Sequence, residues 1–215
     1  MIHIEPLMTR LSARRPIFHS EADFQHELAI ELRAMDPALA LRLEYPFGLG
    51  ARASLDILLR KKNVLAGLEL KYLCRAADVS VAGEAFRLRH QSAHDIRRYD
   101  VCKDVVRMEA FCERFGATGG VLILTNDPAY WSPRRHADTF DAAFNLADLR
   151  VLGGTLAWAE GAGSGTTRGR EVPLAIAGSY PLAWRDYADV GGAGGRLRYL
   201  FIPIGCVETR GAADA

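Results

Sequence analysis

The sequence has little cysteine, almost no net charge and no long apolar run. Its four cysteines show no Cys-x-x-Cys spacing, so we expect no disulfide framework and a reducing compartment. The formal net charge of +1 neither demands nor excludes a polyanionic partner, and any basic surface must be local. No stretch approaches a membrane span, and the first residues lack the apolar segment of a secretory signal. We therefore expect a soluble, cytoplasmic protein that does not bind membranes.

Apolar residues make up 49% of the 215 residues, which is enough for a sizeable core without disulfides. We expect a single domain with an irregular N-terminal arm over residues 1–19, because Pro6 and Pro16 argue against a continuous helix there. The core should cover residues 20–133. A C-terminal extension over residues 134–210 should pack on the same domain, either by extending its sheet or as a flanking subdomain.

Hydrophobic periodicity in the core predicts the order helix, three strands, long helix and strand. The first helix should begin after Ser20, a good N-cap, and end before Pro37. The strands are expected at Leu39–Pro46, Ser54–Leu59, Val64–Tyr72 and Gly120–Thr125, and the long helix from about Phe86 to Phe115. Residues 74–85 are predicted to be a loop. A helical crossover predicts that the last two strands are parallel, which gives an α/β (α+β) fold with a mixed central sheet flanked by helices.

The stretch around which the sequence is organised is residues 54–72, two alternating strands joined by a tight polar turn. The apolar face of its first strand is predicted to carry Leu55, Ile57 and Leu59. A two-residue turn at 62–63 sets a register in which Asp56 lies opposite Glu69, with Lys71 on the same face. Two carboxylates and one ammonium group should therefore converge.

Like charges placed that close destabilise a sheet unless a cation offsets them, so Asp56 and Glu69 suggest a metal site. Carboxylate oxygens suit hard divalent cations such as Mg²⁺ or Mn²⁺. Both acids would be direct ligands, with the backbone carbonyl of Leu70 close by.

Three acids on the first helix could serve this site. The buried stripe of that helix is predicted to comprise Phe24, Leu28, Leu32 and Met35. Glu21 continues the stripe, where an unpaired carboxylate is costly, but a Glu in the first turn also suits the helix dipole. Glu31 flanks the stripe and Glu27 lies further round. Both interpretations of Glu21 remain open at this point.

The combination of a helix acid, then Asp56, then Glu69-Leu70-Lys71 thirteen residues later, resembles the PD-(D/E)XK nuclease superfamily. The resemblance covers about the first 125 residues and implies a restriction-endonuclease-like αβββαβ core. Leu55 departs from the pattern, because it stands where the family name has proline.

The resemblance also implies roles for individual residues. Asp56, Glu69 and Leu70 would bind Mg²⁺ or Mn²⁺, and Glu21 would bind a second metal or a metal-bound water. Lys71 would orient the attacking water or stabilise transition-state charge. Accessory positions beside the site would be Gln25 on the first helix and Asp95, Arg98 and Tyr99 on the second.

The function that follows is metal-dependent hydrolysis of phosphodiester bonds in nucleic acid, most simply by a DNA endonuclease or exonuclease that can work as a homodimer. The alternative is a non-catalytic nuclease-like module that binds nucleic acid or a protein partner. His90 and His94 could form a metal pair on a helix, but no third ligand is evident. Basic residues on the second helix alternate with acids, which is typical of a salt-bridged helix rather than a nucleic-acid stripe.

Overall fold

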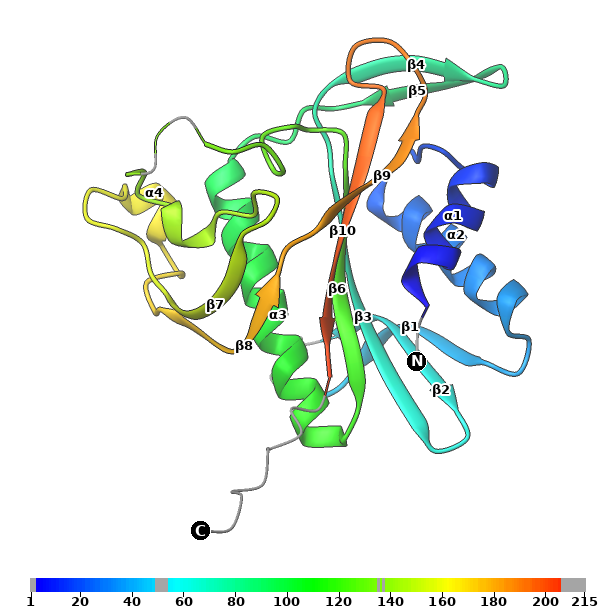
Figure 1. Cartoon of the computed structure of the whole chain (residues 1–215), viewed down its shortest axis with the longest axis horizontal. Helices are drawn as coiled ribbons and strands as arrows, with labels where there is room; N and C mark the ends of the chain where they lie inside the picture. The colour runs from blue at the N-terminus through cyan, green and yellow to red at the C-terminus, as the bar shows by residue number, and fades with distance from the viewer. Residues whose placement is uncertain (1–2, 49–53, 135, 137, 206–215) are drawn as a thin grey trace.

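The structure is a computed structural model that describes residues 3–48, 54–134, 136 and 138–205. It is a mixed α+β fold built on a six-stranded mixed sheet (Figure 1). Its helices are α1 (Ile4–Arg14), α2 (Glu21–Met35), α3 (His94–Phe115) and α4 (Ser164–Thr167), with a 3₁₀ turn, η1 (Ala142–Phe144). Its strands are β1 (Ala40–Pro46), β2 (Ser54–Lys61), β3 (Val64–Leu73), β4 (Ala77–Val81), β5 (Glu84–Leu88), β6 (Thr118–Thr125), β7 (Val151–Leu156), β8 (Leu174–Pro181), β9 (Trp184–Asp189) and β10 (Arg196–Ile204).

The central sheet has the strand order β1-β2-β3-β6-β10-β9. Strands β3 and β6, joined through α3, are parallel as predicted, and every other neighbouring pair is antiparallel. The C-terminal extension contributes β9 and β10 to the sheet, while β7 and β8 form a separate hairpin. The extension therefore both extends the central sheet and forms a flanking unit, two outcomes that were expected as alternatives.

Two hydrophobic cores lie on opposite faces of this sheet. Helices α1 and α2 cover one face, and α3 with the β7–β8 hairpin covers the other (Figure 1). The side chains of β3 alternate between them. Leu68 and Leu70 enter the α1–α2 core, whereas Leu73 enters the α3 core. Because Glu69 and Lys71 lie between these positions, they are directed towards α3.

The prediction that residues 1–19 are irregular is wrong for residues 4–14, which form α1. Pro6 lies in the first turn, where a backbone N–H has no partner within the helix, so the proline costs little. Leu7 and Leu11 are buried at helical spacing and attach α1 to the sheet through the first core. The helical spacing of these apolar residues therefore outweighs a proline that lies in the first turn.

The predicted loop at residues 74–85 and the helix start at Phe86 are also wrong. The chain forms the β4–β5 hairpin, which turns at Ala82 and Gly83 with φ values of 50° and 86°, and α3 begins only at His94. Phe86 is buried on this hairpin, stacked on the ring of His19 with a centroid distance of 4.3 Å. Short strands with few alternations resemble loops in sequence.

Helix α2 begins as predicted, since the backbone N–H of Asp23 donates to Ser20 Oγ at 3.1 Å. Phe24, Leu28 and Leu32 are buried, but Met35 is 39% exposed because it lies in the last turn and lines an open groove. The predicted buried stripe is therefore one residue too long.

Helix α3 lies unusually close to the sheet at two glycines. A Cβ atom on Gly119 would be 2.5 Å from Met108 Sδ and 2.6 Å from the carbonyl oxygen of Gly67. A Cβ atom on Gly67 would itself lie 3.0 Å from Leu55 Cδ1 and 3.0 Å from Phe111 Cε1. This close approach brings the polar side chains of α3 next to Glu69.

Candidate active site

The β2–β3 hairpin has the predicted register, from Lys61 paired with Val64 to Ile57 paired with Leu68. The backbone ladder between the two strands ends there. Beyond this point, the backbone N–H of Leu70 donates to Asp56 Oδ2 at 2.5 Å. The strands separate at the position where the two acids were expected to face each other, and a carboxylate replaces the missing backbone acceptor.

Strand β2 is irregular at Asp56. The β1–β2 pairing continues on both sides but skips Asp56 and Glu44, whose φ is 49°. As a result, Leu55 packs in the core beneath α3, while Ile57 packs beneath α1 and α2. The prediction that Leu55 and Ile57 share one face is wrong, because the alternation changes phase at the acid.

Glu69 is a buried acid, with 2% of its surface exposed. Its Oε1 atom lies 3.1 Å from Arg107 Nη2, but among the described residues no group donates a hydrogen bond to it. Burial, together with the nearby carboxylates of Asp104 and Asp56, raises the pKa of Glu69 to about 9. Burial likewise raises the pKa of Asp56 to about 6, against the opposing effects of the Leu70 amide and Lys71.

Lys71 lies two residues after Glu69, with its Nζ 2.8 Å from Asp104 Oδ2. It also donates to the backbone carbonyl of Leu70 at 3.1 Å. Burial opposes its charge, but the carboxylates of Asp104, Glu21 and Asp56 outweigh burial and raise the pKa of Lys71 above its ordinary value. Lys71 is therefore an ammonium group held between two oxygen atoms.

Two α3 residues complete this group, and neither was predicted to belong to it. Asp104 is 4% exposed, and its Oδ1 accepts a hydrogen bond from Arg107 Nη1 at 3.0 Å. Ion pairs therefore run without a break from Lys71 through Asp104 and Arg107 to Glu69. Asp104 lies in the buried stripe formed by Val101, Val105 and Met108, so the argument applied to Glu21 could have found it.

Of the three candidate acids on α2, Glu21 is the one that reaches the hairpin. Its Oε2 accepts the backbone N–H of Tyr72 at 2.8 Å, and the residue lines a pocket of about 440 Å³ beside Lys71. The residue is exposed, however, so it does not continue the buried stripe. The buried acid of the helix is Glu31, at 5%, which pairs with Arg10 on the helix α1 that was not predicted.

Gln25 lies beside the site as expected. Its Nε2 donates to the backbone carbonyl of Asp56 at 2.8 Å and to Glu44 Oε1 at 2.8 Å. It therefore holds both residues of the β1–β2 irregularity in place.

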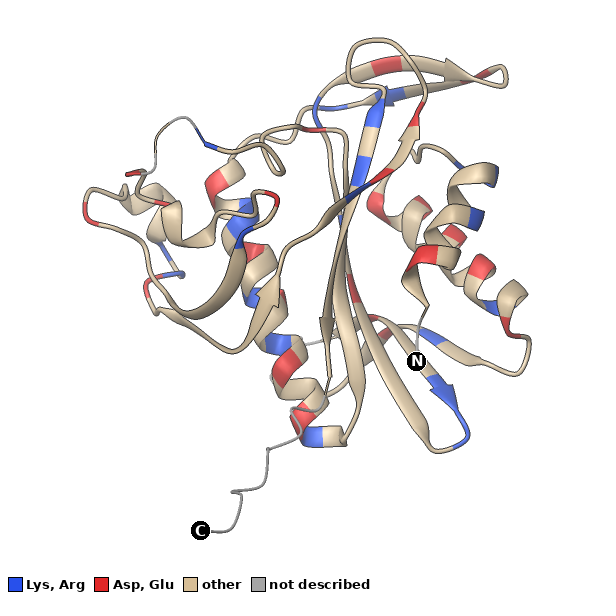
Figure 2. Cartoon of the chain, viewed as in Figure 1, with Lys and Arg blue, Asp and Glu red and all other residues tan. Residues whose placement is uncertain are grey.

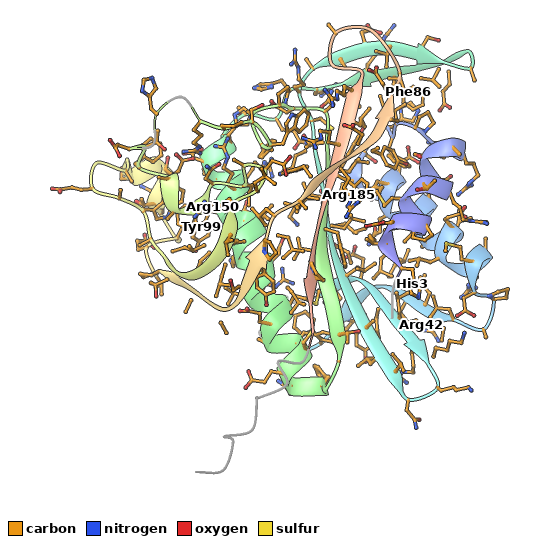
Figure 3. All side chains as sticks on the ribbon, in the orientation of Figure 1. His3, Arg42, Phe86, Tyr99, Arg150 and Arg185 are labelled. Carbon is orange, nitrogen blue, oxygen red and sulfur yellow. The ribbon has the colours of Figure 1, made fainter. Side chains whose placement is uncertain are left out.

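Three predicted accessory residues lie elsewhere, in contact with the C-terminal extension. Asp95 Oδ2 accepts a hydrogen bond from Thr166 at 3.0 Å, and Arg98 pairs with Asp141 at 3.1 Å. Tyr99 lies among aromatic side chains of the extension, on the side of α3 where Figure 3 labels it. The extension covers this face of α3, which could not be foreseen while its own fold was unassigned.

His90 and His94 do not lie on one helix, because α3 begins at His94, and His94 Nε2 lies 2.8 Å from Asp127 Oδ2. Among the described residues, no group of three or more His, Cys, Asp or Glu side chains is arranged to hold a metal ion.

No protein-family model matches the sequence, and neither a curated protein nor a solved structure was found to match it. In the part of the chain that the structure describes, no helix has both the length and the hydrophobicity to cross a membrane.

Proposed function

We propose that this chain hydrolyses phosphodiester bonds of nucleic acid, most simply DNA, with the help of a divalent cation bound at Asp56 and Glu69. The observation that carries the proposal is Glu69, a buried carboxyl whose Oε1 accepts no hydrogen bond among the described residues, although Arg107 Nη2 lies 3.1 Å away, and which has two further acids beside it. Such an arrangement is costly unless a cation completes it.

The charges of the site fit a divalent cation. Four carboxyl groups lie near two cationic side chains; the residues are Glu21, Asp56, Glu69 and Asp104 against Lys71 and Arg107. With all four carboxyls ionised, the surplus is two negative charges. One Mg²⁺ or Mn²⁺ would offset this surplus. The raised pKa of Glu69, about 9, means that without a cation this carboxyl holds a proton at neutral pH, and a bound divalent cation would displace that proton.

The donor atoms fit as well. Mg²⁺ keeps several waters and needs only one or two carboxylates, so Asp56 and Glu69 suffice without a cluster of three. A role for the Leu70 carbonyl stays a prediction, because that oxygen accepts a hydrogen bond from Lys71. When bound, the cation supplies Lewis-acid stabilisation of the phosphate and an acidified water.

The remaining chemistry belongs to the side chains. Lys71 offers a fixed positive charge to the phosphoryl oxygens, where negative charge develops in the transition state. Asp104 and Arg107 hold Lys71 and Glu69 in place. One carboxylate oxygen of Glu21 accepts the backbone N–H of Tyr72. Glu21 also lines the pocket, where it would accept a hydrogen bond from a water bound to the cation.

The element order supports a restriction-endonuclease-like fold for this part of the chain. Helix α2, strands β1 to β3, helix α3 and strand β6 follow one another with β3 and β6 parallel, and the β4–β5 hairpin is an insertion. A homodimer and a cytoplasmic location stay predictions.

A non-catalytic binding module is the second candidate. It is favoured by one observation, namely that Asp56 and Glu21 each accept a backbone N–H of β3 and so have a structural use. That use does not extend to Glu69, which supports the catalytic proposal.

The test is cleavage of labelled DNA and RNA oligonucleotides with Mg²⁺, Mn²⁺ or EDTA. Wild-type protein should cut with metal and not in EDTA, and Glu69→Gln should lower the rate on the order of 100-fold or more. The control Glu113→Gln, which replaces an exposed acid on α3, should change nothing. Absence of cleavage of either nucleic acid with any divalent cation would overturn the proposal.

A further inference from the structure

One face of α3 lines the pocket of about 440 Å³ beside Lys71. Its polar residues are Arg97, Asp100, Lys103, Asp104 and Arg107. At about 100° per residue these positions fall within about 120° of the helix circumference. The face is mixed in charge, as the alternating bands along α3 in Figure 2 show.

The cations of this pocket fall into two groups. Lys71 and Arg107 are engaged by the buried acids of the site. Arg97 and Lys103 are exposed, and within the described residues their side chains make no ion pair or hydrogen bond. Asp100 lies between them and interacts with the charge of Arg97, but its own ion pair is with Arg170, at 4.0 Å. A cation that no internal acid neutralises keeps its positive potential for a ligand.

We propose that Arg97 and Lys103 bind phosphates that flank the reacting one, so that the substrate is a nucleic-acid strand rather than a single phosphodiester. This inference rests on the proposed function. The two residues are six positions apart, which is about 9 Å along the helix axis, or the axial length of two to three nucleotides in a B-form strand. Contacts of this kind position a strand without reading its sequence.

The two groups of cations in the pocket are expected to have different roles, because one pairs with buried acids and the other is exposed. The inner cations hold the buried acids and face the reacting phosphate, while the outer pair determines affinity for the polymer. Loss of Arg97 and Lys103 should therefore weaken binding and leave the internal structure unchanged, since neither side chain supports another residue.

The experiment measures binding by fluorescence anisotropy in EDTA, which prevents cleavage. The probes are a fluorescein-labelled 20-nucleotide single strand and the corresponding duplex, titrated at several salt concentrations. The variant is Arg97→Gln/Lys103→Gln. The matched control is Arg33→Gln/Lys62→Gln, an exposed arginine and lysine outside this pocket whose side chains make no ion pair among the described residues.

The comparison uses the probe that wild-type protein binds more tightly. In the Arg97→Gln/Lys103→Gln variant, the negative slope of log affinity against log salt should become less steep by about 2, or about 1 per lost phosphate contact. Affinity near 0.1 M salt should fall roughly tenfold, with the melting temperature unchanged. The control should behave as wild type. An unchanged slope, an equal loss in the control or no binding of either probe would overturn the inference.

The outcome is separate from that of the proposed function. Loss of binding in the variant, with no cleavage by wild type under any metal, would support the strand contact and overturn the catalysis. Cleavage by wild type with an unchanged salt slope in the variant would overturn only the strand contact.

Discussion

Two buried glutamates show how differently this fold treats a carboxyl group. Glu31 on α2 is 5% exposed and lies between two arginines of α1, with Arg10 at 2.5 Å and Arg14 at 3.5 Å. Glu69 on β3 is 2% exposed, makes its one ion pair among the described residues with Arg107 at 3.1 Å, and has two other acids beside it. The first acid is neutralised by α1, although Arg14 also pairs with Glu27 at 2.8 Å, and its role is structural. The second has an Oε1 atom that accepts no hydrogen bond among the described residues and lies near two other acids, which is why we propose that a cation binds there.

The largest effect should come from removing one lysine or arginine from the surroundings of each acid, namely Lys71 near Glu69 and Arg10 at Glu31. Lys71→Ala should lower turnover on the order of 100-fold or more, because its charge acts mainly in the transition state, and should leave metal binding nearly intact. Arg10→Ala removes a cation of the structural pair and should lower stability without changing turnover. Single-turnover kinetics and thermal melts check both. Equal losses of turnover in the two variants would remove the distinction between the glutamates.

A smaller effect of opposite sign should follow from neutralising each acid. Glu31→Gln should destabilise the fold by about 1–2 kcal/mol, because it leaves two partly exposed arginines without their acid. Glu69→Gln should stabilise the metal-free protein at pH 8, because Glu69 with its pKa of about 9 must bind a proton on folding at that pH, whereas an amide need not. Urea unfolding in EDTA measures both. Destabilisation of similar size in the two variants would contradict the comparison.

The pH dependence of stability tests the same contrast through the protonation of the acids. A carboxyl whose pKa is higher in the native state binds more protons there than in the unfolded chain, so stability falls as pH rises between the two values. For Asp56 that window runs from 3.8 to about 6, and for Glu69 from 4.5 to about 9. Urea midpoints in EDTA should therefore fall between pH 5 and pH 8. Glu69→Gln should flatten the part above pH 6, and an equally steep fall in that variant would contradict this account.

The hairpin could be predicted because strong local rules agree on it. Alternation and a two-residue turn determine the β2–β3 register, and the register places Glu69 and Lys71 on one face. The change in side-chain alternation at Asp56 could not be predicted in the same way. It depends on the left-handed backbone of Glu44, which has no marker in the sequence because glutamate rarely adopts it.

The rest of the site depends on tertiary contacts. Asp104 was visible as an acid in a buried stripe, but its partners Lys71 and Arg107 are defined only once α3 packs against β3. That packing depends on the absence of a side chain at Gly119, which sequence alone does not link to α3. The contacts of Asp95 likewise depend on the C-terminal extension, whose strands are short and separated by glycine-rich turns.

The most direct test of the central claim is calorimetric titration of Mn²⁺ into wild-type protein, Asp56→Asn and the control Asp100→Asn at pH 7.5. Asp100 lies on α3 and lines the pocket beside Lys71, but it is not one of the proposed ligands. If Asp56 and Glu69 hold the cation, wild type and the control should bind Mn²⁺ with equal affinity, and Asp56→Asn should lose binding and the accompanying rise in melting temperature. Equal Mn²⁺ affinity in wild type and Asp56→Asn would contradict the account.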